Sequence, residues 1–252
     1  MEKENYILET KGITKIFPGV RALDKVDFQL KKGEIHALVG ENGAGKSTTI
    51  LMMLGLTEPT EGSVRVCGID PERHPLEVKR RVGYLPEDVG FYDNRDGVFN
   101  LIYTARLNSI PEDEAKTRAL ELLQMVGLKD AAKKNAGQYS RGMRQRLGLA
   151  DVLIKNPEIA ILDEPTSGID PQGVNFFLNL ILKLRDEHGL TVLFSSHNLH
   201  QVEEVCDRVA IFNSGKLQAV GNIEALSNQI FGESGHNLEE IYNCFFEGGT
   251  EQ

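Results

Sequence analysis

The sequence predicts an α/β protein, because segments typical of strands and segments typical of helices alternate along most of the chain. Two mostly apolar runs of strand length, residues 35–39 and 159–162, lead directly into residues that carry chemistry. Residues 97–107 and 112–126 instead show the patterns of helices. With 252 residues, the chain is long enough for one large domain or for a core with a subdomain.

The composition is that of a globular protein, with 40% apolar and 26% charged residues. No run approaches the roughly 18 to 20 apolar residues that span a bilayer. The start, Met1-Glu2-Lys3-Glu4-Asn5, lacks the basic and apolar regions of a signal peptide. We therefore expect a cytoplasmic protein that is still free to dock on a membrane protein. The last residues, 248–252, are expected to form a frayed end.

The charge and the cysteines exclude further classes of function. A formal net charge of −9 disfavours a broad nucleic-acid interface, so no nucleic-acid partner is expected. The three cysteines, Cys67, Cys206 and Cys244, are far apart and lack the paired spacing of a zinc site. We interpret them as reduced thiols that mainly contribute to packing.

The chain before residue 40 has the pattern of β structure. Residues 26–30 alternate apolar and polar side chains, as a half-buried strand does. Pro18-Gly19 predicts a turn beside Phe17. Phe17 then has two interpretations: an exposed ring that stacks on a purine base, or an ordinary core residue.

The stretch Gly40-Glu41-Asn42-Gly43-Ala44-Gly45-Lys46-Ser47-Thr48 fits the phosphate-loop (Walker A) pattern. The glycines allow successive N–H groups to turn inward around a triphosphate, and the following helix start adds its free N–H groups. Lys46 supplies a full charge to the phosphates, and the Ser47 hydroxyl is a Mg²⁺ ligand in this pattern. The alternative, a plain glycine-rich turn, is disfavoured by the strand before the loop and the helix after it.

The segment after the phosphate loop changes character at Pro86. Residues 63–67 are expected to form a short strand, and a second strand ends at Pro86. Residues 88–138 then form a helical insertion without a clear strand. Pro111 and Gly127 stand where the known preferences for helix starts and ends place them.

A second helix start carries a group of basic residues. Ser140 occupies the N-cap position of a helix that continues through Leu153, and its first turn contains arginines. Positive charge is unfavourable at the positive end of a helix dipole. An anionic partner at Ser140 would relieve this conflict.

Two carboxylates, Asp163 and Glu164, follow the apolar run 159–162. Adjacent acids at the end of a buried strand are costly unless a charge offsets them. A Mg²⁺ ion beside Asp163, with Glu164 directed at a water molecule, would do so. The alternative is that both acids only cap the next segment.

The last part of the chain adds one further candidate residue. Residues 166–171 form a tight turn that opens a helix through Arg185, and residues 191–194 form a strand that ends near His197. Ligands bind at this edge of open α/β sheets, although a lone histidine is often structural. Residues 208–212 and 216–220 predict a hairpin, and residues 224–246 predict helical structure.

The order of these motifs resembles the nucleotide-binding domain of ATP-binding cassette (ABC) transporters over about residues 7–222. The most specific feature is Tyr139-Ser140-Arg141-Gly142-Met143 shortly before residues 159–164, followed by Ser167-Gly168-Ile169-Asp170 and His197. The resemblance implies a P-loop NTPase core with a mostly parallel sheet, an antiparallel β subdomain and a helical subdomain insertion. It places the ATPase domain at residues 1–226, its helical subdomain at about 88–155, and a helical tail at 227–252.

The resemblance also implies site roles for ATP and Mg²⁺. Two cassettes close head to tail, so that each ATP lies between the phosphate loop of one chain and the signature helix of the other. Glu164 polarises the attacking water and His197 contacts the γ-phosphate. The implied nucleotide contacts are Phe17, Gly40, Asn42, Gly43, Gly45, Lys46, Ser47, Thr48, Ser140, Gly142 and Asp170. The implied metal-side residues are Ser47, Glu87 and Asp163.

Two motifs depart from the family pattern. Glu87 replaces the usual glutamine, which adds negative charge beside the phosphates and removes an amide donor. Tyr139, Arg141 and Met143 replace the usual Leu, Gly and Gln of the signature. Pro-Glu and Ser-Arg-Gly-Met at these sites are similar to ATPase subunits of exporter-type (ABC-2) cassettes. The residues retained, Ser140 and Gly142, predict function with an altered rate or affinity.

The sequence therefore predicts an ATPase subunit that drives export through a separate membrane permease, at the inner face of the membrane. Its expected partners are a second cassette, identical or related, and that permease, whose docking groove is expected around residues 89–101. An importer ATPase is the alternative within transport. Outside transport, the alternatives are a soluble cassette protein and a non-hydrolysing, ATP-gated subunit.

Overall fold

The computed structural model describes residues 6–246. The expectations for Met1-Glu2-Lys3-Glu4-Asn5 and for residues 248–252 concern positions outside these residues. Within residues 6–246, no helix is both long enough and apolar enough to cross a bilayer.

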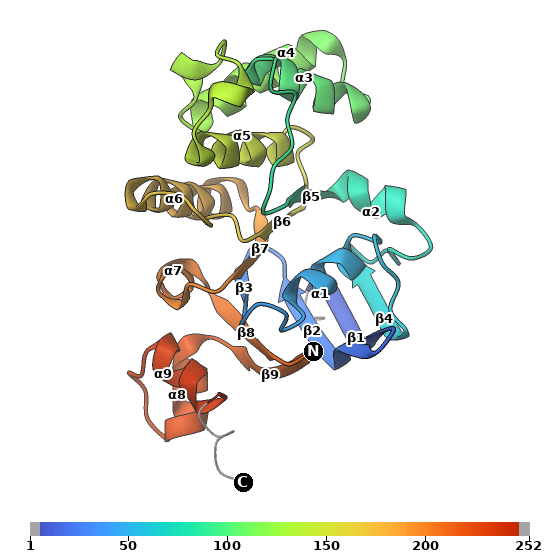
Figure 1. Ribbon diagram of the computed structural model, residues 1–252, viewed down its shortest axis with the longest axis vertical. Coiled ribbons are helices and arrows are strands. Elements are labelled where there is room, and N and C mark those ends of the chain that lie inside the picture. The colour runs from blue at the N-terminus through green and yellow to red at the C-terminus, as the bar shows by residue number, and fades with distance from the viewer. Residues whose placement is uncertain (1–5, 247–252) are drawn as a thin grey trace.

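A six-stranded sheet runs through the centre of the fold in the order β5-β6-β7-β3-β8-β9 (Figure 1). Its neighbours are parallel from β5 to β8, and β9 pairs antiparallel with β8. The strands are β3 (Ile35–Val39), β5 (Val82–Leu85), β6 (Ile159–Asp163), β7 (Thr191–Ser196), β8 (Arg208–Asn213) and β9 (Lys216–Gly221). Because β3, β6 and β7 are buried along their whole length, their sequences are nearly continuous apolar runs rather than alternating ones.

A second sheet, antiparallel and three-stranded, has the order β2-β1-β4. It consists of β1 (Tyr6–Phe17), β2 (Val20–Lys31) and β4 (Glu61–Val66). The strand expected at 63–67 ends one residue earlier, since Cys67 has a φ of +52° and cannot continue it. Together the two sheets confirm the predicted class: a mostly parallel core with an antiparallel β subdomain.

Four helices pack near the central sheet: α1 (Lys46–Met53), α2 (Pro75–Arg81), α6 (Pro171–His188) and α7 (Leu199–Val205). The α1 helix begins at Lys46, directly after the glycines of the phosphate loop, as the pattern predicts. The α6 helix extends three residues past the expected end at Arg185 and is ended by Gly189 in the left-handed conformation.

The insertion forms a layer of its own, beyond α6 at the top of Figure 1. It contains α3 (Gly97–Leu107), α4 (Glu112–Met125) and α5 (Arg141–Leu153), with short 3₁₀ turns at Lys129–Ala131 and Ala136–Gln138. Asp96 caps α3 by accepting a hydrogen bond from the Phe99 N–H. The apolar faces of α3, α4 and α5 join one hydrophobic cluster that continues to the central sheet. The helical layer is therefore tied to the core chiefly through α5.

The C-terminal segment is helical, as the pattern of residues 224–246 predicts, but it is broken in two. The structure has α8 (Ile223–Phe231) and α9 (Leu238–Cys244). Gly232, with a φ of +78°, ends α8 in the left-handed conformation. Asn237 and Glu240 then start α9 with a reciprocal capping box.

Candidate functional site

The loop between β3 and α1 fits into a space that only glycine allows at two positions. Gly40 has a φ of +157°, and a Cβ there would lie 2.5 Å from the Phe212 carbonyl oxygen at the end of β8. Gly45 has a φ of +109°, and a Cβ would lie 2.5 Å from Leu23 Cδ2 on β2. The loop is thus held closely between the two sheets, with its backbone N–H groups at the carboxyl edge of the central one.

Lys46 is the central cation of this edge. Its side chain is only 6% exposed, and Nζ donates hydrogen bonds to the carbonyl oxygens of Gly40 at 2.7 Å and Glu41 at 3.1 Å. Nζ also lies 3.9 Å from Glu164 Oε1. Desolvation lowers the pKa of Lys46, and the Glu164 and Asp163 carboxylates oppose that shift. Among residues 6–246, the partners of the ammonium group are thus two loop carbonyls and one more distant carboxylate. The group is held in place but has no close anionic partner.

A serine joins the two acids at the end of β6. Ser195 Oγ on β7 donates to Asp163 Oδ1 at 2.6 Å and accepts from the Glu164 N–H at 2.9 Å. Ser47 Oγ lies 3.4 Å from the same Asp163 oxygen. Glu164 has a φ of +47°, a left-handed backbone that is costly for a glutamate and is held here by the bond to Ser195.

The carboxylate of Glu164 is directed toward His197 and Lys46. His197 Nδ1 lies 2.9 Å from Glu164 Oε2, while the other oxygen, Oε1, is buried and accepts no hydrogen bond from any of residues 6–246. The Glu164 side chain is 12% exposed and that of His197 is 62% exposed. One carboxylate oxygen is therefore oriented by the histidine, and the other lies 3.9 Å from Lys46 Nζ without a hydrogen bond from the described residues.

Ser195 was not among the residues expected from the sequence. In the sequence it was only part of a polar strand end beside His197. The parallel pairing of β6 with β7 aligns Asp163 with Ser195, and that pairing brings the serine to both acids. No local pattern in the sequence carries this information.

Replacing Ser195 by alanine is expected to lower ATP turnover about tenfold, because it leaves the buried Glu164 N–H without an acceptor and frees the strained backbone. Steady-state hydrolysis and thermal unfolding measure the two effects. Thr191→Val is the matched control, since Thr191 Oγ1 accepts from the Gly33 N–H at the opposite end of the same strand. An equal loss of turnover in both variants would show that the effect is only one of stability.

The start of α5 is capped as predicted, and its arginines already have partners. Ser140 Oγ accepts from the Met143 N–H at 3.3 Å. Arg141 Nε donates to the Ser167 carbonyl at 2.6 Å, and Arg144 Nη1 donates to Asp93 Oδ1 at 2.6 Å. Within the described chain, no hydrogen bond or ion pair joins Ser140 to the phosphate loop.

Glu87 and Asp170 contact the same turn after Glu164. Glu87 Oε1 accepts from Ser167 Oγ at 3.3 Å, and its backbone carbonyl accepts from Gln145 Nε2 at 2.8 Å. Among residues 6–246, the Glu87 carboxylate is thus hydrogen-bonded to Ser167, and not to Ser47 or Asp163. Asp170 caps α6 by accepting from the Gly173 N–H at 3.0 Å.

The remaining predicted residues lie on the open side of the loop. Phe17 ends β1 and is 42% exposed, with Lys15 Nζ 5.0 Å from its ring centre, so it is not a core residue. Asn42 and Gly43 are exposed, and Thr48 is half-buried in α1. The Phe17 ring is therefore partly exposed, with the Lys15 ammonium group above it.

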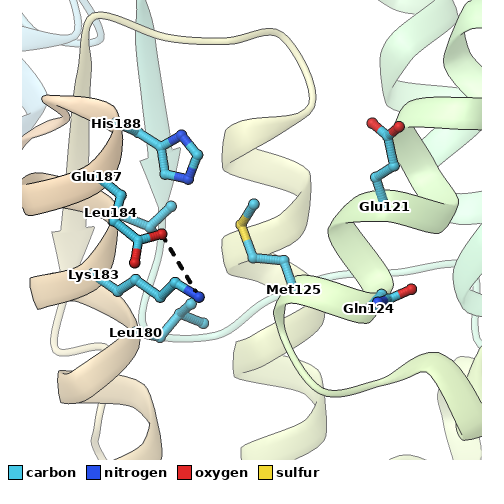
Figure 2. A pocket seen from close by; sticks show the side chains of 8 residues that line it. All are labelled: Glu121, Gln124, Met125, Leu180, Lys183, Leu184, Glu187 and His188. Carbon is cyan, nitrogen blue, oxygen red and sulfur yellow. Dashed lines mark ion pairs between the residues drawn. The ribbon is translucent and has the colours of Figure 1, made fainter.

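A pocket of about 340 Å³ lies between α4 and α6, away from the phosphate loop. Figure 2 shows Met125 and Glu121 on one wall and His188, Leu184 and the ion-paired Lys183 and Glu187 on the other. It contains none of the residues of the β3-α1 loop or of the β6 end. Its walls combine apolar and charged side chains of α4 and α6, and none of these side chains belongs to the phosphate-loop site.

Comparison with known proteins gives consistent matches. The family model described as ABC transporter matches residues 23–167. The bacitracin transport ATP-binding protein BcrA of Bacillus licheniformis is 40% identical over 84% of this chain and 68% of its own length. The linearmycin resistance ATP-binding protein LnrL of Bacillus subtilis is 36% identical over 90% of this chain and 73% of its own.

Solved structures agree in fold. A structure of the ATP-binding subunit of an ABC transporter has a TM-score of 0.86 and 30% identity, over 95% of this chain and 99% of that one. A dimeric cassette in a post-hydrolysis state, bound to ADP and Pi, has a TM-score of 0.77 and 25% identity, over 85% of this chain and 98% of that one.

Proposed function

Because this chain belongs to the ABC transporter family and is an ATP-binding and ATP-hydrolysing subunit of it, we propose that it powers export through a separate membrane permease. Cassettes of this family dimerise and pair with transmembrane subunits. The observation that carries the proposal is the position of Glu164, whose backbone is held by Ser195 and whose carboxylate is held by His197, with a second oxygen that has no hydrogen-bond partner among residues 6–246. This is the arrangement that a group acting on an attacking water needs.

Lys46 and His197 contribute charge and contact on either side of Glu164. When ATP enters, Lys46 exchanges its loop carbonyls for phosphate oxygens, a stronger charge-assisted partner. His197 orients the Glu164 carboxylate and reaches the γ-phosphate from the end of β7. The loop residues Gly40, Asn42, Gly43, Gly45, Ser47 and Thr48 surround the phosphates, and Phe17 stacks on the adenine.

Magnesium fits the donor set beside the phosphate loop. The Ser47 hydroxyl and an Asp163 oxygen are 3.4 Å apart, and both are the hard oxygen donors that Mg²⁺ prefers. We propose that these two residues hold the ion and that Glu87 approaches the same region once Ser167 releases it. Bound Mg²⁺ supplies positive charge that neutralises the phosphate oxygens.

We propose that the dimer completes the site, because among residues 6–246 Ser140 Oγ accepts only from its own helix, at the Met143 N–H. We propose that Ser140 and Gly142 contact the γ-phosphate held by the partner and that Asp170 links the two sites. The dimeric relative bound to ADP and Pi supports this assembly. ATP then favours the closed dimer, and hydrolysis releases it. Whether the second cassette is identical or related, the same contacts apply.

Export is favoured over import by the roles of the relatives. BcrA serves bacitracin transport and LnrL linearmycin resistance, while a methionine import ATP-binding protein of Carboxydothermus hydrogenoformans is 33% identical over 84% of this chain. Removal of a compound from the cell explains resistance to that compound. We further propose an ATPase domain over 1–226, with the helical subdomain at about 88–155 and a tail from 227, at the inner face of the membrane.

The permease is proposed to dock beside α3, in a pocket of about 320 Å³. Tyr92 and Tyr103 line it and are 48% and 40% exposed. At its wall, Asp151 Oδ1 is buried and has no hydrogen-bond partner in the part of the chain described. An inserted permease segment with apolar side chains and one donor for Asp151 would satisfy both features.

The same carboxylate predicts a pH effect on stability. Burial raises the pKa of Asp151 from 3.8 to about 6, against smaller opposing contributions from Thr104 and Lys155. Since the folded state holds this proton more tightly than the unfolded one, the ionised carboxylate destabilises the fold increasingly as pH rises toward about 6. Asp151→Asn is expected to raise the free energy of unfolding at pH 7.5 by up to about 3 kcal/mol, and by progressively less as the pH falls toward about 4. Urea unfolding at several pH values measures this, with the exposed Asp130→Asn as control. A gain that does not depend on pH would contradict the assignment.

The proposed function is tested by measuring ATP hydrolysis by the purified chain, with Mg²⁺ or with EDTA, while light scattering follows the dimer. Turnover that requires Mg²⁺ and rises more steeply than the first power of protein concentration supports a dimeric motor. Turnover proportional to protein concentration, from a species that remains monomeric with ATP, would contradict it.

For the direction of transport, cells that express the chain with its permease are challenged with peptide antibiotics. Sensitivity equal to that of cells carrying Glu164→Gln would contradict export of such compounds.

A further inference from the structure

The first turn of α5 is fastened to the turn that follows Glu164 by a single arginine. Arg141 Nε donates to the Ser167 carbonyl at 2.6 Å, and Arg141 Nη2 lies 4.0 Å from Asp88 Oδ1. The Ser167 N–H in turn donates to the Glu164 carbonyl at 3.1 Å. Two hydrogen bonds therefore connect the Arg141 guanidinium to the backbone of Glu164.

The position of the guanidinium depends on a glycine in the same turn. Gly168 has a φ of +68°, and a Cβ there would lie 2.8 Å from Arg141 Nε and 2.9 Å from Arg141 Cδ. Since the arginine end is flexible, an added methyl group would displace it from Ser167. The glycine thus admits the arginine in addition to allowing the left-handed backbone.

A second, apolar contact joins the same two segments. Ile169 lies between Gly142 and Gly173, where an added Cβ would be 3.2 Å and 2.5 Å from Ile169 Cγ2. The Gly142 end of α5 therefore packs on residue 169, while Arg141 holds residue 167. The turn cannot shift relative to the first turn of α5 without breaking both contacts.

We propose that Arg141 is a positioning residue that transmits occupancy of the signature helix start to Glu164 in the same chain. The inference rests on the proposed function, in which Ser140 and Gly142 contact the partner's ATP. When that ATP arrives, the first turn of α5 is fixed, and Arg141 fixes Ser167 and the backbone of Glu164 with it. Each chain then hydrolyses its own ATP efficiently only when its partner is also loaded. Glycine at this position, the usual family residue, lacks the link.

The test compares hydrolysis by the full chain with and without the link. Arg141→Ala is expected to lower kcat about tenfold, to change KM less, and to bring the Hill coefficient for ATP toward 1. Arg141→Lys, which retains a donor and the charge, is expected to restore most of the rate. Arg118→Ala is the matched control: it removes an arginine of the same helical layer whose Nη1 donates to the Ile154 carbonyl at 3.3 Å. It is expected to leave the Hill coefficient unchanged.

A double-mutant cycle with Gly168→Ala makes the test independent of general stability. Gly168→Ala is expected to lower turnover in the wild-type background and to cause a several-fold smaller loss in the Arg141→Ala background. Equal losses in both backgrounds, or an unchanged Hill coefficient in Arg141→Ala, would overturn the inference. If Arg141→Ala does not fold, Arg141→Gln replaces it in the same cycle. Turnover proportional to protein concentration, from a wild-type chain that remains monomeric with ATP, would instead overturn the proposed function itself, so the two failures are distinguishable.

Discussion

Replacing Glu164 by glutamine is expected to lower ATP turnover about a thousandfold and to leave an ATP-bound dimer that does not reopen. Glutamine has the shape of glutamate and keeps a hydrogen bond to His197, which lies 2.9 Å from Glu164 Oε2. It cannot accept a proton from the attacking water, and it removes a negative charge from beside the phosphates. Single-turnover hydrolysis and size exclusion with ATP measure the two effects.

The control for this variant is Glu158→Gln, a change of the same kind at a glutamate paired with Arg81 at 3.5 Å outside the site. It should hydrolyse ATP as the wild type does. Turnover by Glu164→Gln within tenfold of the wild type would show that another group activates the water. A monomeric Glu164→Gln protein at saturating ATP would contradict the closed dimer.

The second large effect is expected from Lys46→Met, which should weaken ATP binding about a hundredfold or more. Methionine fills a similar volume but removes the positive charge that Lys46 offers to the phosphates. Because desolvation lowers the pKa of Lys46, its ammonium group is costly to bury, and its loss should change the melting temperature by only a few degrees. Calorimetric titration with ATP measures the affinity.

Lys155→Met is a matched control for Lys46. Lys155 is also a partly buried lysine with a pKa lowered by desolvation, and its Nζ donates to the Lys79 carbonyl at 2.6 Å. It lies away from the phosphate loop, so its loss should leave ATP affinity unchanged. An equal fall in affinity for both variants would indicate that the Lys46 effect comes from altered folding.

The two halves of the site have different structural roles. The first half meets at one sheet edge and consists of Lys46, Asp163, Glu164 and His197. All four residues come from one chain, and the nucleotide and metal are proposed to bind beside them. Ser140 and Gly142 start a helix of the separate layer, and their closest links are to the turn after Glu164. This separation explains why the proposed mechanism needs a second cassette.

The sequence by itself determined the features that depend on local patterns. The loop at Gly40 and Gly45, the cap at Ser140 and the helices of the insertion follow from residue type and spacing, and the structure places them within one or two residues of expectation. Short-range rules suffice there, because turn and cap geometry depends on neighbouring residues. The same rules missed the break in the C-terminal segment at Gly232, where a left-handed cap stops α8.

Only the tertiary structure decided which distant groups meet. The pairing of β6 with β7 brings Ser195 to Asp163 and Glu164, and the packing of α5 on residue 169 directs Arg141 to Ser167. The arginines of α5 looked like an unmatched charge in the sequence, yet Arg144 is paired with Asp93 from 51 residues away. Such contacts depend on sheet register and helix packing. Burial over the whole core fixes both, so no single position in the sequence indicates them.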